Sequence, residues 1–132
     1  MIGYVTLGTN DIDRARTYYD ALLSEIGATR KMEFPETGFT LYGTGDRRPG
    51  IAVTRPYDGK PASAGNGNMA ALAMESRDMV DRLHARALEL GGTDEGAPGL
   101  RTPEGPSAFY GAYFRDPDGN KLCLFRMGPA QA

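Results

Sequence analysis

The sequence predicts an α+β fold built from two βαβββ modules, and two observations support this prediction. An extended segment, an amphipathic helix and further extended segments follow one another twice along the chain of 132 residues. Tyr4 and Met69 open the two equivalent copies. One such module cannot bury its own sheet, so the two should form a curved mixed sheet with a concave cavity and helices on the outer face.

The first module is expected at residues 1–54, where strand formers at 4–7 precede a helical pattern. Asn10 and Asp11 offer a helix cap, and Gly27 lies where the helix should end. Between them, apolar side chains recur at steps of three and four and form one stripe: Ile12, Ala15, Tyr19, Leu22 and Ile26. Three further strands are expected at 29–34, 39–42 and 51–54.

The second module is expected at residues 68–127, after a connecting loop at 55–67 that is rich in glycine and proline. A strand at 69–74 precedes Ser76, which can cap a helix. The apolar stripe of that helix is Val80, Leu83, Ala87 and Leu90. A glycine- and proline-rich loop is expected at 96–106, with a weak strand signal near Thr93, and a turn at 116–120 should join strands at 108–115 and 121–126.

Composition narrows the range of possible functions. The net charge is -2 and the charges are interspersed, which does not fit the basic stripe of a nucleic-acid-binding protein. No apolar run approaches the roughly 20 residues of a membrane span. Cys123 is the only cysteine, so an intrachain disulfide is impossible. We therefore expect a single domain at residues 1–132, located in the cytoplasm, with neither nucleic acid nor membrane as partner.

Two segments resemble a known superfamily. The run Tyr4-Val5-Thr6-Leu7-Gly8, followed by Asp11, Ala15 and Tyr18-Tyr19, resembles the first strand and helix of the vicinal-oxygen-chelate proteins. These include glyoxalase I, extradiol dioxygenases and bleomycin-binding proteins. The segment Tyr113-Phe114-Arg115-Asp116-Pro117-Asp118-Gly119-Asn120 closely resembles their last hairpin. With the repeat, the resemblance covers nearly the whole chain and implies the same fold.

The resemblance also implies where a metal would be held. In metal-using relatives the ligands come from the first and last strand of each module, where His and Glu are usual. The equivalent positions are Tyr4, approximately Ala52, Met69 and Cys123. None is His, Asp or Glu, so we expect no bound metal and no other cofactor.

Strand alternation identifies candidate ligand-binding residues, because alternate side chains point away from the helix and into the concavity. Arg55 is added because a guanidinium beside the connecting loop could hold an anionic group. The candidates are Tyr4, Thr6, Ala52, Arg55, Met69, Ala71, Tyr113, Cys123 and Phe125. The pattern identifies no catalytic residue. His84, the only histidine, is expected on the surface or flank of the second helix.

These observations favour a protein that binds a small, aromatic or amphipathic molecule in a metal-free cavity. Two alternatives stay open. One is a metal-dependent lyase or dioxygenase of the glyoxalase type, so whether the protein is an enzyme is undecided. The other is a structural or partner-interaction protein without a ligand. A two-fold homodimer is expected because exposed strand edges are commonly closed by pairing of chains.

Overall fold

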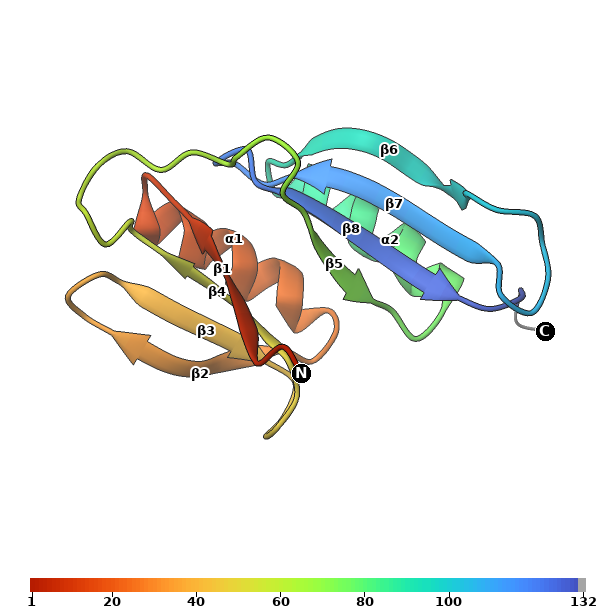
Figure 1. Cartoon of the computed structure of the whole chain (residues 1–132), viewed down its shortest axis with the longest axis horizontal. Coiled ribbons are helices and arrows are strands. Elements are labelled where there is room, and N and C mark those ends of the chain that lie inside the picture. The colour runs from red at the N-terminus through yellow and green to blue at the C-terminus, as the bar shows by residue number, and fades with distance from the viewer. Residues whose placement is uncertain (131–132) are drawn as a thin grey trace. The chain divides into compact units, whose positions relative to one another are not determined.

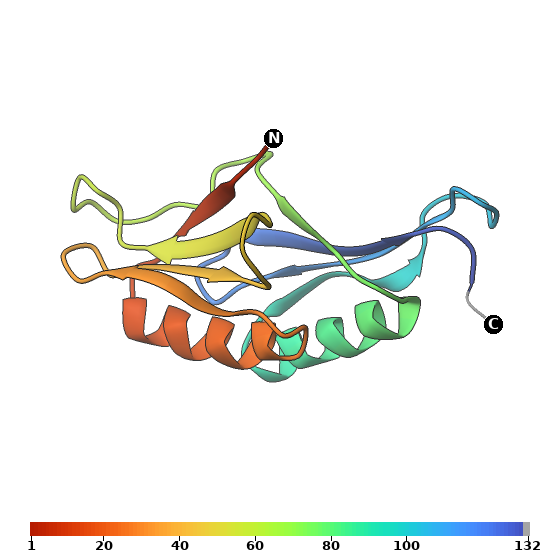
Figure 2. The ribbon, with the colours of Figure 1, turned by 90° about the horizontal axis from the view of Figure 1, so that it is seen from below.

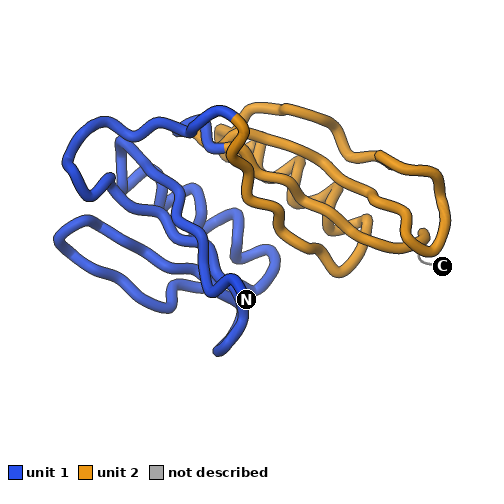
Figure 3. The backbone as a smooth tube through the Cα atoms, in the orientation of Figure 1, with its two compact units in different colours: residues 1–66, 118–120 blue, residues 67–117, 121–132 orange. Residues whose placement is uncertain are grey.

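The computed structural model describes residues 1–130 and contains the two helices and eight strands in the repeated order that the sequence predicts. The strands form two four-stranded mixed sheets, ordered β1-β4-β3-β2 and β5-β8-β7-β6. Residues 1–66 with 118–120 form one compact unit, and residues 67–117 with those from 121 onward form the other (Figure 3). The predicted α+β fold is confirmed. None of the helices in the described part of the chain is long and apolar enough to cross a bilayer.

The first unit consists of one helix and its sheet. Its elements are β1 (Tyr4–Gly8), α1 (Ile12–Ser24), β2 (Thr29–Phe34), β3 (Phe39–Gly43) and β4 (Gly50–Thr54). Strand β1 pairs in parallel with β4, while β4 and β2 each pair antiparallel with β3. The side chain of Asp11 caps α1 by accepting a hydrogen bond from the backbone N–H of Arg14. Helix α1 lies along one face of this sheet (Figures 1 and 2).

The core of the first unit lies between α1 and the sheet. Tyr19 and Leu22 of the helix are buried, as are Ile51 and Val53 of β4. The hydroxyl of Tyr42, also buried, donates a hydrogen bond of 2.8 Å to Asp20 Oδ1. Other buried members of this core are Ile12, Ala15, Tyr18, Leu23 and Thr40. Burial raises the pKa of the Tyr42 hydroxyl, so Tyr42 remains the donor toward Asp20.

The second unit repeats this arrangement. Its elements are β5 (Ala70–Ala73), α2 (Arg77–Glu89), β6 (Thr93–Leu100), β7 (Phe109–Arg115) and β8 (Lys121–Met127). Strand β5 pairs in parallel with β8, and β7 pairs antiparallel with both β8 and β6. Helix α2 lies along one face of the sheet (Figures 1 and 2). Its core consists of Val80, Leu83, Ala87, Ala112, Phe114, Leu122 and Leu124, all buried.

Two local predictions are wrong. The loop expected at 96–106 begins later, because residues 96–100 belong to β6. Gly96 and Gly99 lie opposite Tyr113 and Gly111 of β7, so ladder hydrogen bonds outweigh the low strand propensity of glycine. His84 is buried rather than on the surface or flank. Its Nε2 lies 3.0 Å from Asp94 Oδ1 and 3.2 Å from the carbonyl oxygen of Tyr113, which satisfies the ring inside the protein.

The turn predicted at 116–120 is present between β7 and β8. Its residues also form hydrogen bonds with the segment that joins β1 to α1. Asp118 accepts hydrogen bonds from the Thr9 hydroxyl at 2.6 Å and the Asn10 backbone N–H at 2.9 Å. Arg14 forms an ion pair with the same carboxylate at 3.0 Å. Asn120 donates to the carbonyl oxygen of Gly8. The turn therefore holds the segment where β1 passes into α1.

Alternation along β8 yields a stability prediction. Leu124 is fully buried against the helix side, whereas Met127 points to the other side and is 56% exposed. Leu124→Ala should lower the free energy of unfolding by about 2–5 kcal/mol, because it leaves a cavity in the core. Met127→Ala should change it by less than about 0.5 kcal/mol. Urea denaturation of both variants measures this, and equal losses would mean that the two faces of β8 are assigned incorrectly.

Candidate functional site

Each sheet has one face packed on its helix and one face pointing away from it, which we call the distal face. Strand pairing and alternation assign the residues of each distal face. The distal face of the first sheet carries Tyr4, Thr6, Met32, Phe34, Phe39, Leu41 and Ala52. The distal face of the second sheet carries Ala71, Ala73, Phe109, Tyr113, Arg115, Lys121, Cys123, Phe125 and Met127.

The distal face of the first sheet is aromatic and partly exposed. The ring of Phe39 lies 5.7 Å from that of Tyr4 and 5.4 Å from that of Phe34. Tyr4 is 54% exposed and Phe34 is 50% exposed. Thr6 pairs with Ala52, so these two predicted site residues are neighbours, but the side chain of Ala52 is buried. This face therefore offers apolar contact through Tyr4 and Phe34 rather than through Ala52.

The distal face of the second sheet brings four of the predicted residues together. Cys123 lies opposite Ala71 on one side and Tyr113 on the other, across three adjacent strands. Phe125, one step along β8, stacks on Phe109 with the ring centroids 5.3 Å apart and the planes 7° from parallel. Ala71 is exposed and Phe125 is half-buried, whereas Cys123 is buried. Together the exposed Ala71 and the half-buried rings of Tyr113, Phe125 and Phe109 form an apolar surface, which we call the floor.

Two cations flank the tyrosine of this floor. The Arg101 guanidinium carbon lies 5.3 Å from the centre of the Tyr113 ring, and Lys121 Nζ lies 5.5 Å from it. Burial raises the pKa of the Cys123 thiol, while a hydrogen bond to Tyr113 and the charges of Arg101 and Lys121 act in the opposite direction. Burial has the largest effect, so the pKa of the thiol is raised on balance, which does not favour the thiolate that a nucleophile needs.

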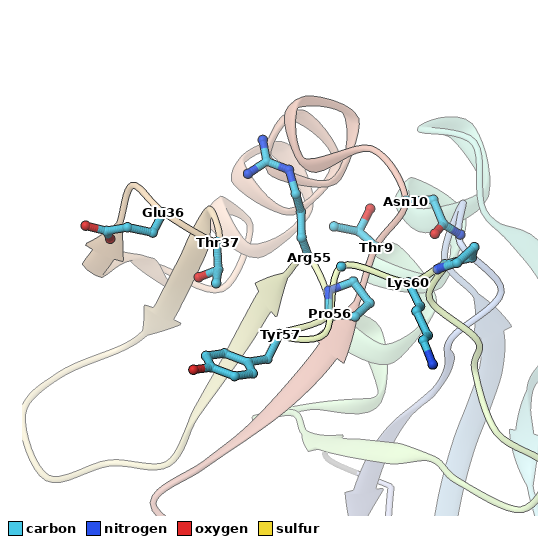
Figure 4. A pocket seen from close by; sticks show the side chains of 10 residues that line it. Thr9, Asn10, Glu36, Thr37, Arg55, Pro56, Tyr57 and Lys60 are labelled. Atoms are coloured by element: carbon cyan, nitrogen blue, oxygen red, sulfur yellow. The ribbon is translucent and has the colours of Figure 1, made fainter.

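Arg55 and Met69 lie outside the strands that form the two distal faces. Met69 precedes β5 and is 47% exposed. Arg55 follows β4 on the side of α1, since a Cβ added at Gly38 would meet both Ile12 and an Arg55 nitrogen. It lines a cleft of about 440 Å³ in the first unit, together with Thr9, Asn10, Glu36, Thr37, Pro56, Tyr57, Gly59, Lys60 and Pro61. Figure 4 shows the side chains of Arg55 and Lys60 pointing in different directions, so they do not converge on one point.

The residues at the four expected ligand positions do not fit a divalent metal. Tyr4 and Ala52 are not even paired, because Tyr4 lies opposite Gly50. Met69 offers only a thioether and Ala52 has no donor atom, so Cys123 would be left without the His and carboxylate ligands that a divalent metal usually takes. Within residues 1–130 no three His, Cys, Asp or Glu side chains gather closely enough to hold a metal ion. The distal faces therefore present aromatic rings and positive charges rather than a set of metal ligands.

The residues around the second distal face that were not among the sequence-predicted candidates include Phe109, Arg101 and Lys121. Lys121 carries the same period-of-two signal as Cys123 and Phe125, so alternation alone could have included it. Phe109 could be found in the same way from Tyr113. Arg101 follows β6, and its position over Tyr113 depends on this strand, of which the sequence gives only a weak signal near Thr93.

The repeated βαβββ unit is the architecture of the superfamily that the sequence resembles, and comparisons with known proteins agree. The model of the Glyoxalase/Bleomycin resistance protein/Dioxygenase superfamily matches residues 1–124. The chain belongs to this superfamily.

Several solved structures resemble the chain. A glyoxalase/bleomycin resistance protein from Albidiferax ferrireducens is 34% identical, with a TM-score of 0.82 over 96% of this chain and 98% of that one. A family enzyme from Burkholderia phytofirmans is 20% identical, with a TM-score of 0.72 over 95% and 97%. A lactoylglutathione lyase from Agrobacterium tumefaciens is 20% identical, with a TM-score of 0.65 over 96% and 92%. The last two show the fold alone. A search of curated proteins finds no match.

Proposed function

We propose that this protein binds a small, aromatic or amphipathic molecule at the distal face of the second sheet, without a metal. The observation that carries the proposal is the floor formed by Phe109, Tyr113 and Phe125 beside the exposed Ala71. Aromatic rings with a few polar groups at their edge are the usual lining of small-molecule sites. The similarity to a protein named for bleomycin resistance supports a binding role.

The alternative of a metal-dependent lyase or dioxygenase has less support. Its support is the family and a structure named lactoylglutathione lyase, which shares only 20% identity with this chain. Such chemistry needs ligands for a metal, and Tyr4, Ala52, Met69 and Cys123 do not supply them. If the protein only contacted a partner and bound no ligand, the apolar floor on the distal face of the second sheet would have no assigned role. A cytoplasmic location is proposed from the lone free cysteine.

Binding can be tested with N-phenyl-1-naphthylamine, an uncharged dye whose fluorescence rises in apolar sites. We expect saturable binding that is unchanged by EDTA. Phe125→Ala should weaken binding about five- to tenfold, because one aromatic contact contributes roughly 1 kcal/mol. The matched control is Phe34→Ala, the same change on the distal face of the first sheet, which should leave the affinity within about twofold.

Three results would contradict this proposal. Absence of dye binding to the unmodified protein would remove the ligand site. Loss of binding in Phe34→Ala but not in Phe125→Ala would move the site to the first sheet. Loss of binding in EDTA, restored by zinc or nickel, would favour the metal-dependent alternative.

We also propose a two-fold homodimer that covers the exposed apolar residues of the first sheet. Tyr4, Met32 and Phe34 are each about half exposed, and β1 and β2 are the edge strands of that sheet. Light scattering at micromolar concentration should give the mass of two chains. Phe34→Glu should shift this mass toward one chain, because the substitution places two like charges at the interface.

The matched control for assembly is Met127→Glu, which introduces the same charge at an exposed position of the second sheet. This variant should keep the mass of two chains. A single-chain mass for the unmodified protein, or dissociation by Met127→Glu alone, would contradict the proposed dimer.

A further inference from the structure

The second distal face carries two positive charges that form no ion pair within the described chain. Within residues 1–130, neither Arg101 nor Lys121 forms an ion pair with a carboxylate. Other cations of the same unit are neutralised: Arg115 pairs with Glu95 at 2.7 Å, and Arg77 pairs with Glu104 at 2.6 Å. The paired Arg115 and the unpaired Lys121 are neighbours, because they lie directly opposite each other in the β7–β8 ladder.

Both unpaired cations lie near the ring of Tyr113. Arg101 and Lys121 lie 5.3 Å and 5.5 Å from the centre of the Tyr113 ring, so both charges lie beside the same part of the floor. Two cations near one apolar floor repel each other and attract an anion. One N–H group of Arg101 Nη2 donates a hydrogen bond of 2.7 Å to the carbonyl oxygen of Ala97. A guanidinium has five N–H donors, so others remain for a ligand.

Two glycines make room for Arg101 in this position. A Cβ at Gly96 would lie 2.9 Å from the Tyr113 ring and 3.3 Å from Arg101 Nη2. A Cβ at Gly99 would lie 3.2 Å from Arg101 Nη1. Any other residue at either position would therefore push the guanidinium or the ring away. The arrangement of Arg101 over Tyr113 depends on β6 having no side chains at these two positions.

We propose that the ligand of the second distal face is an aromatic anion, whose ring lies on the Phe125 and Tyr113 floor and whose acidic group is bound by Arg101 and Lys121. This inference rests on the proposed function and adds the charge class of the ligand. A carboxylate or sulfonate attached to an aromatic ring system would satisfy both the floor and the cations. A neutral aromatic molecule would use only the floor.

Two dyes that share one ring skeleton provide the test. 1-Anilinonaphthalene-8-sulfonate carries a sulfonate, and N-phenyl-1-naphthylamine is the same skeleton without it. The unmodified protein should bind the sulfonate dye at least about tenfold more tightly, since a charge-assisted contact contributes roughly 1.5–3 kcal/mol, equivalent to tenfold or more. Arg101→Gln and Lys121→Gln should each weaken binding of the sulfonate dye about fivefold or more and leave the neutral dye within about twofold.

The matched control is Arg48→Gln, which removes the same charge from an exposed position in the first unit. It should leave the affinity for both dyes unchanged, which separates local binding from a change in net charge. Melting curves of all three variants show whether the fold is retained. Arg101 is exposed and Lys121 is only half-buried, so neither substitution should lower the melting temperature by more than about 2 °C.

The outcomes distinguish the charge class from the existence of the site. Equal affinity for the two dyes, or sulfonate binding that survives both substitutions, would overturn the aromatic anion and leave the proposed binding function standing. Failure of both dyes to bind would overturn the proposed function and the anion together. A tenfold preference that is lost in Arg101→Gln and Lys121→Gln, and kept in Arg48→Gln, supports the aromatic anion.

Discussion

Each four-stranded sheet of this protein has a single helix, so only one of its two faces is packed into a core. This constraint assigns the strand residues to one of two faces, although Ala52 and Cys123 are buried on the distal side. Leu122 and Leu124 of β8 are fully buried beneath α2, while Phe125 and Met127 are directed to the distal face. The core residues determine stability, and the distal residues are available for chemistry. The functional argument follows from that division.

The chemistry of the two distal faces differs, although the modules repeat. The first face carries Tyr4, Phe34 and Phe39, whose rings contact one another, and we assign it to assembly. The second carries Tyr113 with Arg101 and Lys121 beside it, and we assign it to ligand binding. Duplication thus supplies one scaffold twice, and the substitutions on each distal face determine what that face contacts.

Periodicity explains how much of this could be predicted from sequence. The stripe of Val80, Leu83 and Ala87 repeats with the helical period, and Cys123 and Phe125 repeat with the strand period, so both could be assigned to faces. The full length of strand β6 could not be predicted in this way, because Gly96 and Gly99 have low strand propensity and are held in the strand by pairing with β7. The buried position of His84 and the bonds from Asp118 to Thr9 and Asn10 depend on contacts between residues distant in sequence.

The central claim is that the distal face of the second sheet is the ligand site. Nuclear magnetic resonance with ¹⁵N-labelled protein, titrated with 1-anilinonaphthalene-8-sulfonate, tests this claim most directly. The claim predicts that the largest amide shift changes occur along β5, β7 and β8, centred on Ala71, Tyr113 and Phe125. Shift changes centred instead on the Arg55 cleft or on β1 and β4 of the first unit would contradict it.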